Sequence, residues 1–193
     1  MTPAVDLDTQ LMLLVQKDDG SSFGELLSRN RNLVVNYLSR MVVNRAIAEE
    51  LAQDVFIRVY RSRQTWEPTA KFSTWLYRIM TNVALNHFRD EKRTRREVSL
   101  DTPDLLQVRR EAQDRAELVE DRLVREVAAR RVRQAIRTLP PKQRAAVIMH
   151  KYDELDYARI AQILGCSPSA VKALMFRAYE TLRLRLQCLN AGV

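Results

Sequence analysis

The chain of 193 residues has few of the residues that form tight turns and covalent crosslinks. Its 4 glycines and 6 prolines are too few for the many hairpins of a β-sandwich or barrel. Its 2 cysteines, Cys166 and Cys188, offer neither a disulfide framework nor a CxxC pair. This cysteine usage fits a reducing cytoplasm.

Long apolar runs are also missing. No segment approaches the roughly 20 apolar residues that span a bilayer. The N-terminus MTPAVDLDTQ is acidic and lacks the basic start and apolar stretch of a secretion signal. We therefore expect a cytoplasmic protein without membrane insertion.

Motifs of enzymes are absent from the sequence. The 2 histidines, His87 and His150, are far apart and neither belongs to an HExxH zinc motif. There is no P-loop and no GxSxG nucleophile elbow. Cys166 stands where a helical turn needs a small residue, so packing explains it better than chemistry does. We expect no catalytic activity, no cofactor and no metal site.

What the chain has in abundance is helix-forming and basic residues. Hydrophobic residues make up 46% of it, and Leu, Ala, Arg, Glu and Gln dominate, so the expected fold class is all-α. The formal net charge of +8 favours an anionic partner, either nucleic acid or an acidic membrane surface. A generically basic protein is the alternative that charge alone leaves open.

Helical periodicity divides the N-terminal half into four segments. Thr9 is predicted to cap a short helix that ends near 18–20, and Ser22 with Glu25 forms a capping box for the second. A third helix is expected over about 46–61 and a fourth over about 72–92. Between them, Pro68 breaks the pattern, which predicts a surface loop over 64–71.

The sequence predicts two small helical domains joined by a charged flexible linker. The stretch 96–123 is dense in both charge signs, poor in large apolar side chains and interrupted by Pro103. Such a segment buries too little apolar area to offset its ordering entropy. We expect domains over 1–95 and 124–193, the second opening with a helix that ends before Pro140 and Pro141.

The segment 157–187 has the spacing of a helix-turn-helix. This motif needs a small residue where the helices cross, a glycine in the turn and an apolar anchor in the second helix. Ala161, Gly165 and Val171 fill these places. Ser167 and Pro168 read as the cap and first turn of the recognition helix.

The exposed start of that recognition helix is predicted to contact DNA. An ordinary helical hairpin with a solvated basic face is the alternative. The predicted contact residues are Ser167, Ser169, Ala170, Lys172, Ala173 and Arg177.

A second candidate nucleic-acid surface lies in the segment 71–93, where aromatic and basic residues alternate. Aromatic faces that stack unpaired bases beside cations are typical of single-strand binding. A core role explains the aromatic residues equally well. Asn82 and Asn86 lie one turn apart, and asparagine can read an adenine edge, although solvated polar positions would look the same.

Three blocks in this order resemble the extracytoplasmic-function (ECF) group of bacterial RNA polymerase sigma factors over most of the chain. The blocks are AEELAQDVFIRVYR, KFSTWLYRIMTNVALNHFRDEKR and LPPKQRAAVIMHKYDELDYARIAQILGCSPSAVKALMFRAYETLR. The resemblance implies a sigma domain 2 that binds core polymerase and melts the −10 element. It also implies a sigma domain 4 that reads the −35 element, with the linker threading toward the active site.

The resemblance also implies roles for individual residues. The core-polymerase contacts would be Gln53, Asp54, Arg58 and Arg61, with Val55, Phe56 and Val59 largely in the core. The second block would melt the −10 element and capture a flipped base, with the binding and melting residues Lys71, Phe72, Ser73, Thr74, Trp75, Tyr77, Arg78, Asn82, Asn86 and Arg89. The implied partners are the β′ and β subunits of polymerase, promoter DNA and an anti-sigma factor.

The recognition helix departs from the family pattern at several positions. Ser169, Ala170, Leu174 and Tyr179 replace residues that the family often has there. We therefore expect few direct base contacts at the −35 element and a larger contribution from DNA shape. The rival reading is a stand-alone repressor or response-regulator domain, which would dimerise on a palindrome. No dimerisation heptad is visible, and transcription with core polymerase would separate the two readings.

Overall fold

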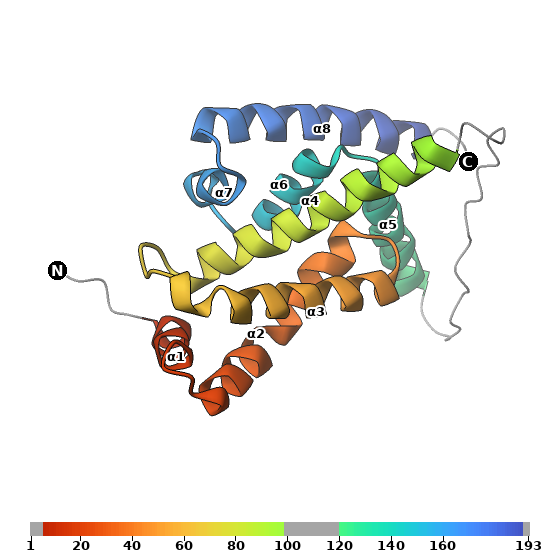
Figure 1. The fold of residues 1–193 in the computed structure, drawn as a ribbon. Coiled ribbons are helices and arrows are strands. Elements are labelled where there is room, and N and C mark those ends of the chain that lie inside the picture. The colour runs from red at the N-terminus through yellow and green to blue at the C-terminus, as the bar shows by residue number, and fades with distance from the viewer. Residues whose placement is uncertain (1–5, 99–119, 191–193) are drawn as a thin grey trace.

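The computed structural model describes residues 6–98 and 120–190, and every regular element in these ranges is helical. The all-α prediction is confirmed (Figure 1). In chain order the elements are α1 (Leu7–Val15), α2 (Gly20–Met41), α3 (Arg45–Arg61), the 3₁₀ turn η1 (Arg63–Thr65), α4 (Phe72–Val98), α5 (Glu120–Arg137), α6 (Pro141–Lys151), α7 (Tyr157–Leu164) and α8 (Pro168–Asn190). None of these helices combines the length and apolar character that crossing a bilayer requires.

The caps predicted for the first two helices are wrong. Asp6, not Thr9, caps α1, and it accepts a hydrogen bond from the Thr9 backbone N–H at 2.9 Å. Asp19, not Ser22, caps α2, since its carboxylate accepts from both following serines. Those hydrogen bonds lower the pKa of Asp19 to about 2. In both cases an aspartate lies just upstream and offers a charged acceptor to the free N–H groups.

The helices around the predicted linker are longer than the periodicity indicated. α4 begins at Phe72 as expected but continues to Val98, and α5 begins at Glu120. These stretches are rich in Arg and Glu, which have high intrinsic helix propensity, so a helix there does not need an apolar pattern. The predicted linker therefore overlaps helix at both ends, and its remainder, including Pro103, lies outside the described residues.

The helix-turn-helix prediction is confirmed at each of its three positions. Ala161 and Val171 are buried, and Gly165 ends α7 with φ 64°. The Ser167 hydroxyl accepts from the Ala170 backbone N–H at 3.2 Å and so caps α8. In α5, Val127 and Val132 are exposed, whereas Ala135 and Ile136 are buried.

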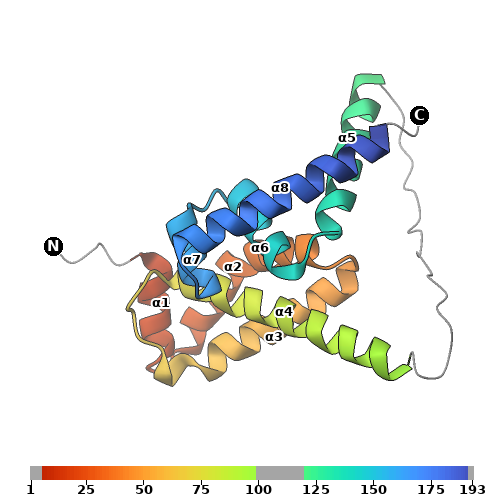
Figure 2. The ribbon, with the colours of Figure 1, turned by 90° about the horizontal axis from the view of Figure 1, so that it is seen from above.

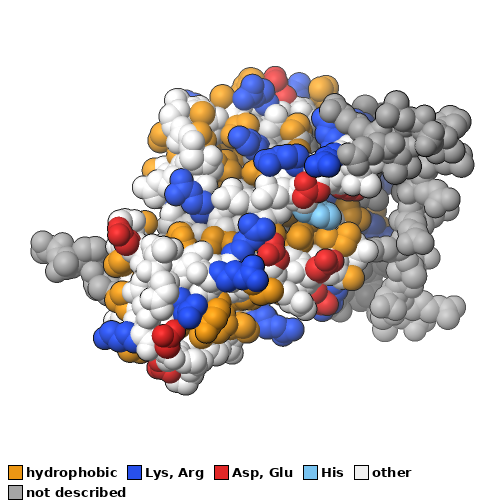
Figure 3. Space-filling model, in the orientation of Figure 1, with side chains coloured by type: hydrophobic (Ala, Val, Ile, Leu, Met, Phe, Trp, Pro, Cys, Tyr) orange, Lys and Arg blue, Asp and Glu red, His pale blue; other side chains and the backbone are white. Residues whose placement is uncertain are grey.

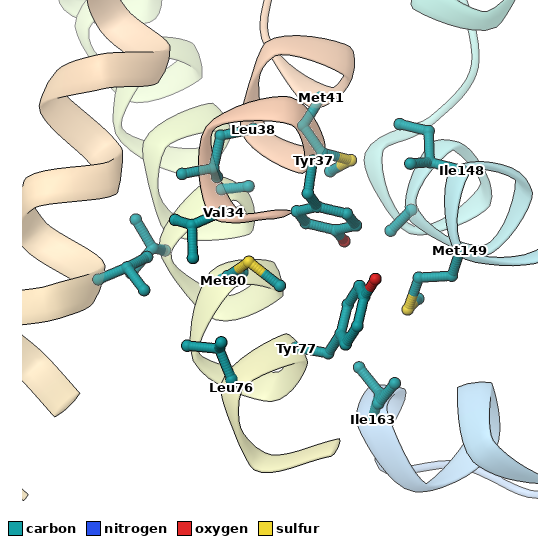
Figure 4. Packing of buried hydrophobic residues seen from close by; sticks show 14 of the residues in the cluster. Val34, Tyr37, Leu38, Met41, Leu76, Tyr77, Met80, Ile148, Met149 and Ile163 are labelled. Atoms are coloured by element: carbon teal, nitrogen blue, oxygen red, sulfur yellow. The ribbon is translucent and has the colours of Figure 1, made fainter. Parts of the chain in front are cut away.

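The two halves of the molecule pack against each other through α4. This helix contacts α1, α2 and α3 on one side and α6 and α7 on the other (Figures 1 and 2). Side chains of α2 and α4, including Tyr37 and Tyr77, face Ile148 and Met149 of α6 (Figure 4). The buried residues form one continuous cluster that crosses from one half to the other.

Candidate nucleic-acid interface

The loop before α4 and the first turns of that helix enclose a pocket of about 290 Å³. The pocket has two indole rings, hydroxyl and carboxylate groups and one guanidinium in its wall. Its lining residues are Trp66, Glu67, Thr69, Ala70, Thr74, Trp75, Arg78 and Gln162. Flat aromatic surfaces beside polar groups suit a nucleobase, which offers a π face and a hydrogen-bonding edge.

Three aromatic rings pack together at this pocket, and two of them, Trp66 and Trp75, line it. Trp66 lies 6.2 Å from Phe72 and 5.9 Å from Trp75, measured between ring centroids, and Phe72 lies 5.6 Å from Trp75. Trp66 and Phe72 are buried, whereas Trp75 is half-buried. The loop is thus fixed by its own aromatic residue, and Trp75 keeps surface to offer a ligand.

Side-chain hydrogen bonds tie the same loop to the end of α1. The Gln16 amide donates to the Trp66 carbonyl at 2.6 Å, and the Gln64 amide donates back to the Gln16 carbonyl at 3.2 Å. The Arg63 guanidinium bonds Asp18 at 3.0 Å and covers the Tyr60 ring at 4.1 Å. We call Gln16, Gln64, Arg63 and Asp18 the loop clamp.

The predicted −10 residues separate into exposed and buried sets. Lys71, Arg78, Asn82 and Arg89 are exposed, and Ser73, Trp75 and Asn86 are half-buried. Lys and Arg side chains lie over both halves of the face in Figure 3, with acidic side chains between them. This exposed set offers cations and amides that can meet phosphates and base edges.

Phe72, Thr74 and Tyr77 lie inside the molecule. Phe72 is 1% exposed and Tyr77 is 3% exposed, so neither presents a surface to DNA in this arrangement. The Tyr77 ring meets Tyr37 edge-on at 5.6 Å, and the Tyr37 hydroxyl hydrogen-bonds Thr81 at 2.8 Å. Spacing alone could not separate these buried aromatics from surface ones, because neighbouring turns of α4 are covered by different helices.

A residue that the sequence did not single out covers the start of α4. Arg159 of α7 donates from Nε to the Thr74 hydroxyl at 3.2 Å and from Nη2 to the Ser73 hydroxyl. Gln162, one turn further along α7, closes one wall of the pocket. The sequence shows a single basic residue in the first helix of the helix-turn-helix, but it does not show that this helix lies against α4.

A second polar contact between the halves surrounds Asp153. Its carboxylate lies 3.8 Å from the Arg40 guanidinium, which also covers the Tyr152 ring at 4.7 Å. Burial raises the pKa of Asp153, and Arg40 and Tyr77 partly oppose that rise. Burial likewise raises the pKa of Tyr77, and the Asp153 charge adds to it.

Arg144 of α6 joins the ends of two helices from opposite halves. It donates at 2.6 Å to the carbonyl of Met41, the last residue of α2, and also to the carbonyls of Arg137 and Leu139 at the end of α5. Its guanidinium covers the Phe88 ring at 4.9 Å. Burial lowers the pKa of Arg144, and the partial negative charge of two helix C-termini offsets part of that cost.

The recognition helix exposes most of its predicted DNA-contacting residues. Ser167, Ser169, Lys172, Ala173 and Arg177 are exposed, and Ala170 is half-buried. Phe176 is also exposed, so an apolar side chain lies beside Arg177 on the surface of α8.

An apolar groove of about 490 Å³ lies between α2 and α3. Two of the four predicted polymerase contacts, Gln53 and Arg61, line it, while Asp54 and Arg58 pair with each other at 3.0 Å outside it. Of the residues expected in the core, Val55 and Val59 are buried, but Phe56 lines the groove. The sequence-based prediction missed the α2 side of the groove, namely Phe23, Leu27, Arg31 and Val35.

Each half of the chain matches a known protein family model. Residues 26–94 match the family model Sigma-70 region 2, and residues 129–182 match Sigma-70, region 4. The ECF RNA polymerase sigma factor SigW of Bacillus subtilis is 32% identical to this chain over 178 residues, which cover 90% of this chain and 93% of SigW. The chain belongs to the ECF group of RNA polymerase sigma factors.

Other relatives and solved structures agree with this assignment. The sigma factor is 33% identical to the RNA polymerase sigma factor CarQ of Myxococcus xanthus, over 84% of this chain and 87% of CarQ. The structure of CnrH in complex with the cytosolic domain of CnrY shares the fold, with a TM-score of 0.66 at 20% identity, covering 97% of this chain and 100% of CnrH. The sigma factor RpoE of Bartonella quintana, solved with the anti-sigma factor NepR, matches with a TM-score of 0.64 at 19% identity, over 86% of this chain and 96% of RpoE.

Family membership settles the class of function. The sigma factor binds core RNA polymerase and directs transcription initiation at promoters, and it is not an enzyme. The Sigma-70 region 2 match lies over α2, α3 and α4, and the region 4 match runs from α5 into α8 and includes the helix-turn-helix.

Proposed function

We propose that the pocket before α4 and the exposed side chains of that helix bind and melt the −10 element. The observation that carries this role is the pocket itself, with Trp66 and Trp75 in its wall and Arg78 at its side. Melting exposes an unpaired base, and an aromatic wall beside a cation stabilises that base and its phosphate. Lys71, Asn82, Asn86 and Arg89 then bind the flanking backbone and base edges.

The apolar groove between α2 and α3 is the proposed docking site for core polymerase. It combines exposed apolar side chains, including Ile57 and Tyr60, with the charged rim residues Arg31 and Arg61. An apolar centre with a charged rim is typical of protein–protein interfaces. The exposed start of α8, with Ser169, Lys172 and Arg177, is the proposed −35 reader.

The proposed roles of α4, the groove and α8 lead to assignments of domain bounds, cellular location and a further partner. We place the −10 and polymerase-binding domain at 1–95, the linker at 96–123 and the −35 domain at 124–193. The polymerase and promoter partners imply a cytoplasmic location. Because CnrH and RpoE were solved with CnrY and NepR, we also propose an anti-sigma partner for this chain.

The test separates promoter melting from polymerase binding in reconstituted transcription. Asn82→Ala is expected to reduce permanganate reactivity of the −10 region while leaving binding to core polymerase unchanged. Ile57→Glu, which puts a charge on a side chain that is 48% exposed in the groove, is expected to weaken core binding at least tenfold. Val43→Glu is the matched control, since Val43 is 54% exposed and lies outside the groove. Equal core binding by the two glutamate variants would refute the groove as the docking site.

A further inference from the structure

We propose that the pocket before α4 selects an unpaired base that carries an exocyclic amino group, and that Glu67 makes this selection. The proposal rests on the −10-binding role of the pocket proposed above. It adds the chemical class of the base to that role. Thymine is disfavoured, because it is the one DNA base without an exocyclic amine.

Glu67 carries the wrong charge for a surface that binds DNA only through its phosphates. A carboxylate repels the DNA backbone, yet Glu67 lines the pocket together with Trp66 and Trp75. Rings that stack on a base and a guanidinium that attracts phosphate both favour DNA, and the wall provides them in its tryptophans and in Arg78. A carboxylate favours DNA only where it accepts from a donor, and the donors of a DNA strand are the N–H groups of its bases.

The two opposite charges of the pocket wall are both free to pair with a ligand. Glu67 and Arg78 are exposed, and neither side chain has a hydrogen bond or an ion pair within residues 6–98 and 120–190. Elsewhere in the first half such charges pair with each other, as Asp54 and Arg58 do at 3.0 Å. The wall therefore offers one group that only accepts and one that only donates.

The backbone that carries Glu67 is held on both sides. The Glu67 carbonyl accepts from the Thr69 backbone N–H at 2.8 Å, and the preceding carbonyl, that of Trp66, accepts from the Gln16 amide at 2.6 Å. A carboxylate on a fixed backbone loses less conformational freedom when it binds than one on a mobile loop does. The position of Glu67 thus suits a residue that reads a base.

The Watson–Crick edges of the four bases differ in how they meet this pair of charges. Cytosine, adenine and guanine each have an amine that donates to a carboxylate, and each also has an acceptor for a guanidinium. Thymine has a single N–H between two carbonyl oxygens, so a carboxylate that approaches this N–H meets an oxygen on either side. Every base can stack on Trp75, and discrimination among bases therefore comes from Glu67 and Arg78.

The test measures the base preference of the full chain bound to core polymerase. The probes are labelled single-stranded dT15 and three oligonucleotides in which cytosine, adenine or guanine replaces the central thymine of dT15. Fluorescence anisotropy gives the affinity for each probe, and core polymerase alone supplies the baseline. The wild-type complex is expected to bind at least one of the three substituted probes about tenfold more tightly than dT15.

Two glutamine variants separate the selection from an effect of charge. Glu67→Gln introduces an amide that donates as well as accepts, so the preference over dT15 is expected to fall to within about twofold. Glu180→Gln removes the same charge from an exposed site on α8 and is expected to keep the wild-type preference. Loss of a negative charge alone would strengthen binding of all four probes equally and leave the preference unchanged.

The outcomes that overturn the proposal are distinct from failure of the underlying function. If the wild-type complex shows no preference, or if Glu67→Gln keeps the wild-type preference, selection by Glu67 is refuted. Trp75→Ala, checked by circular dichroism for its fold, and Asn82→Ala at an exposed site test the underlying function. Both are expected to weaken binding of all four probes. If neither does, the proposed −10 role of α4 fails, and the selection by Glu67 fails with it.

Discussion

The side chains at the start of α4 divide into those that hold the helix in place and those that are free to meet DNA. Phe72 and Tyr77 belong to the first group, and Lys71, Arg78 and Asn82 to the second. A sequence shows only that aromatics and cations alternate here. Which of them point inward depends on α2, α6 and α7, which come together with α4 only in the folded molecule.

If α4 binds the −10 element as proposed, this division makes Phe72 a poor reporter of DNA binding and Asn82 a good one. Phe72→Ala is expected to lower the free energy of unfolding by about 3–5 kcal/mol, because it empties a fully buried site. Asn82→Ala is expected to change it by less than about 0.5 kcal/mol, since Asn82 is exposed. Urea denaturation followed by circular dichroism measures both. Similar losses in the two variants would contradict the burial of Phe72.

Asp153 gives the packing of the two halves a pH dependence whose sign is fixed. Its pKa is raised by burial, so the packed form binds the proton more tightly than the open form does. The cost of burying the charge is absent below the ordinary aspartate pKa of about 4 and is fully present above the raised value. Arg40 and Tyr37 of α2, Tyr77 of α4 and Arg159 of α7 contribute to the electrostatics of this site.

Asp153→Asn is expected to remove that dependence. Above the raised pKa the variant should show less acrylamide quenching of tryptophan than the wild-type protein, because its packed form bears no buried charge. Near pH 4 the two proteins should converge. Parallel quenching curves across the whole pH range would mean that protonation of Asp153 does not change how closely the two halves pack.

At the scale of elements, the loop before α4 takes its shape from α1 as well as from its own aromatic ring. The sequence predicted a surface loop over 64–71 because Pro68 interrupts the periodicity, and the chain there is indeed not α-helical. The partners of the loop lie about 50 residues away, in Gln16 and Asp18. No local pattern predicts such hydrogen bonds, so the loop clamp could be found only in the structure.

Gln16→Ala is expected to impair promoter melting without weakening core binding. It removes the bond to the Trp66 carbonyl and leaves a partly buried acceptor unpaired, at a cost of about 1–3 kcal/mol. Permanganate footprinting should show weaker opening, most clearly at low temperature, while core affinity stays constant. Lys17→Ala, at an exposed neighbouring site, is the control. Unchanged footprints would show that Trp66 is held without Gln16.

The helix-turn-helix is the element that the sequence predicted best, because its requirements are local. Ala161, Gly165 and Val171 lie within 11 consecutive residues, and each is needed for a reason that holds in any protein. A positive φ in the turn, a close crossing and a buried anchor do not depend on the other half of the chain.

The turn glycine can be tested against a second glycine of the same protein. Gly165→Ala is expected to destabilise the fold by about 1–2 kcal/mol, since its φ of 64° is strained for alanine even in open space. Gly24→Ala, inside α2 and equally open, is expected to stabilise it by about 0.5–1 kcal/mol. The opposite signs should appear in thermal unfolding midpoints. The same sign for both would contradict the left-handed turn.

At the scale of the whole molecule, the sequence predicted two domains and said nothing of how they lie together. The linker composition suggested independence, but the buried cluster runs from α2 and α4 into α6 and α7. Apolar residues in α6, such as Ile148 and Met149, serve both the helix-turn-helix and the contact with the first half. Sequence periodicity marks such residues as buried without saying which element buries them.

Because the buried core is continuous, a destabilising substitution in the second half is expected to destabilise the first half as well. Ile160 is fully buried in α7, and Ile160→Ala is expected to cost about 2–5 kcal/mol of stability.

Both tryptophans lie in the first half, so tryptophan fluorescence follows unfolding there, while circular dichroism follows all the helices. If the halves unfold as one unit, the two urea transitions of the wild-type protein coincide, and Ile160→Ala shifts both to lower urea concentration. If the polar contact between the halves opens first, the tryptophan transition keeps its midpoint while the dichroism splits into two steps. The shared core predicts that the two transitions coincide and shift together. When α7 unfolds, α4 loses the residues that pack against it, so the first half unfolds as well.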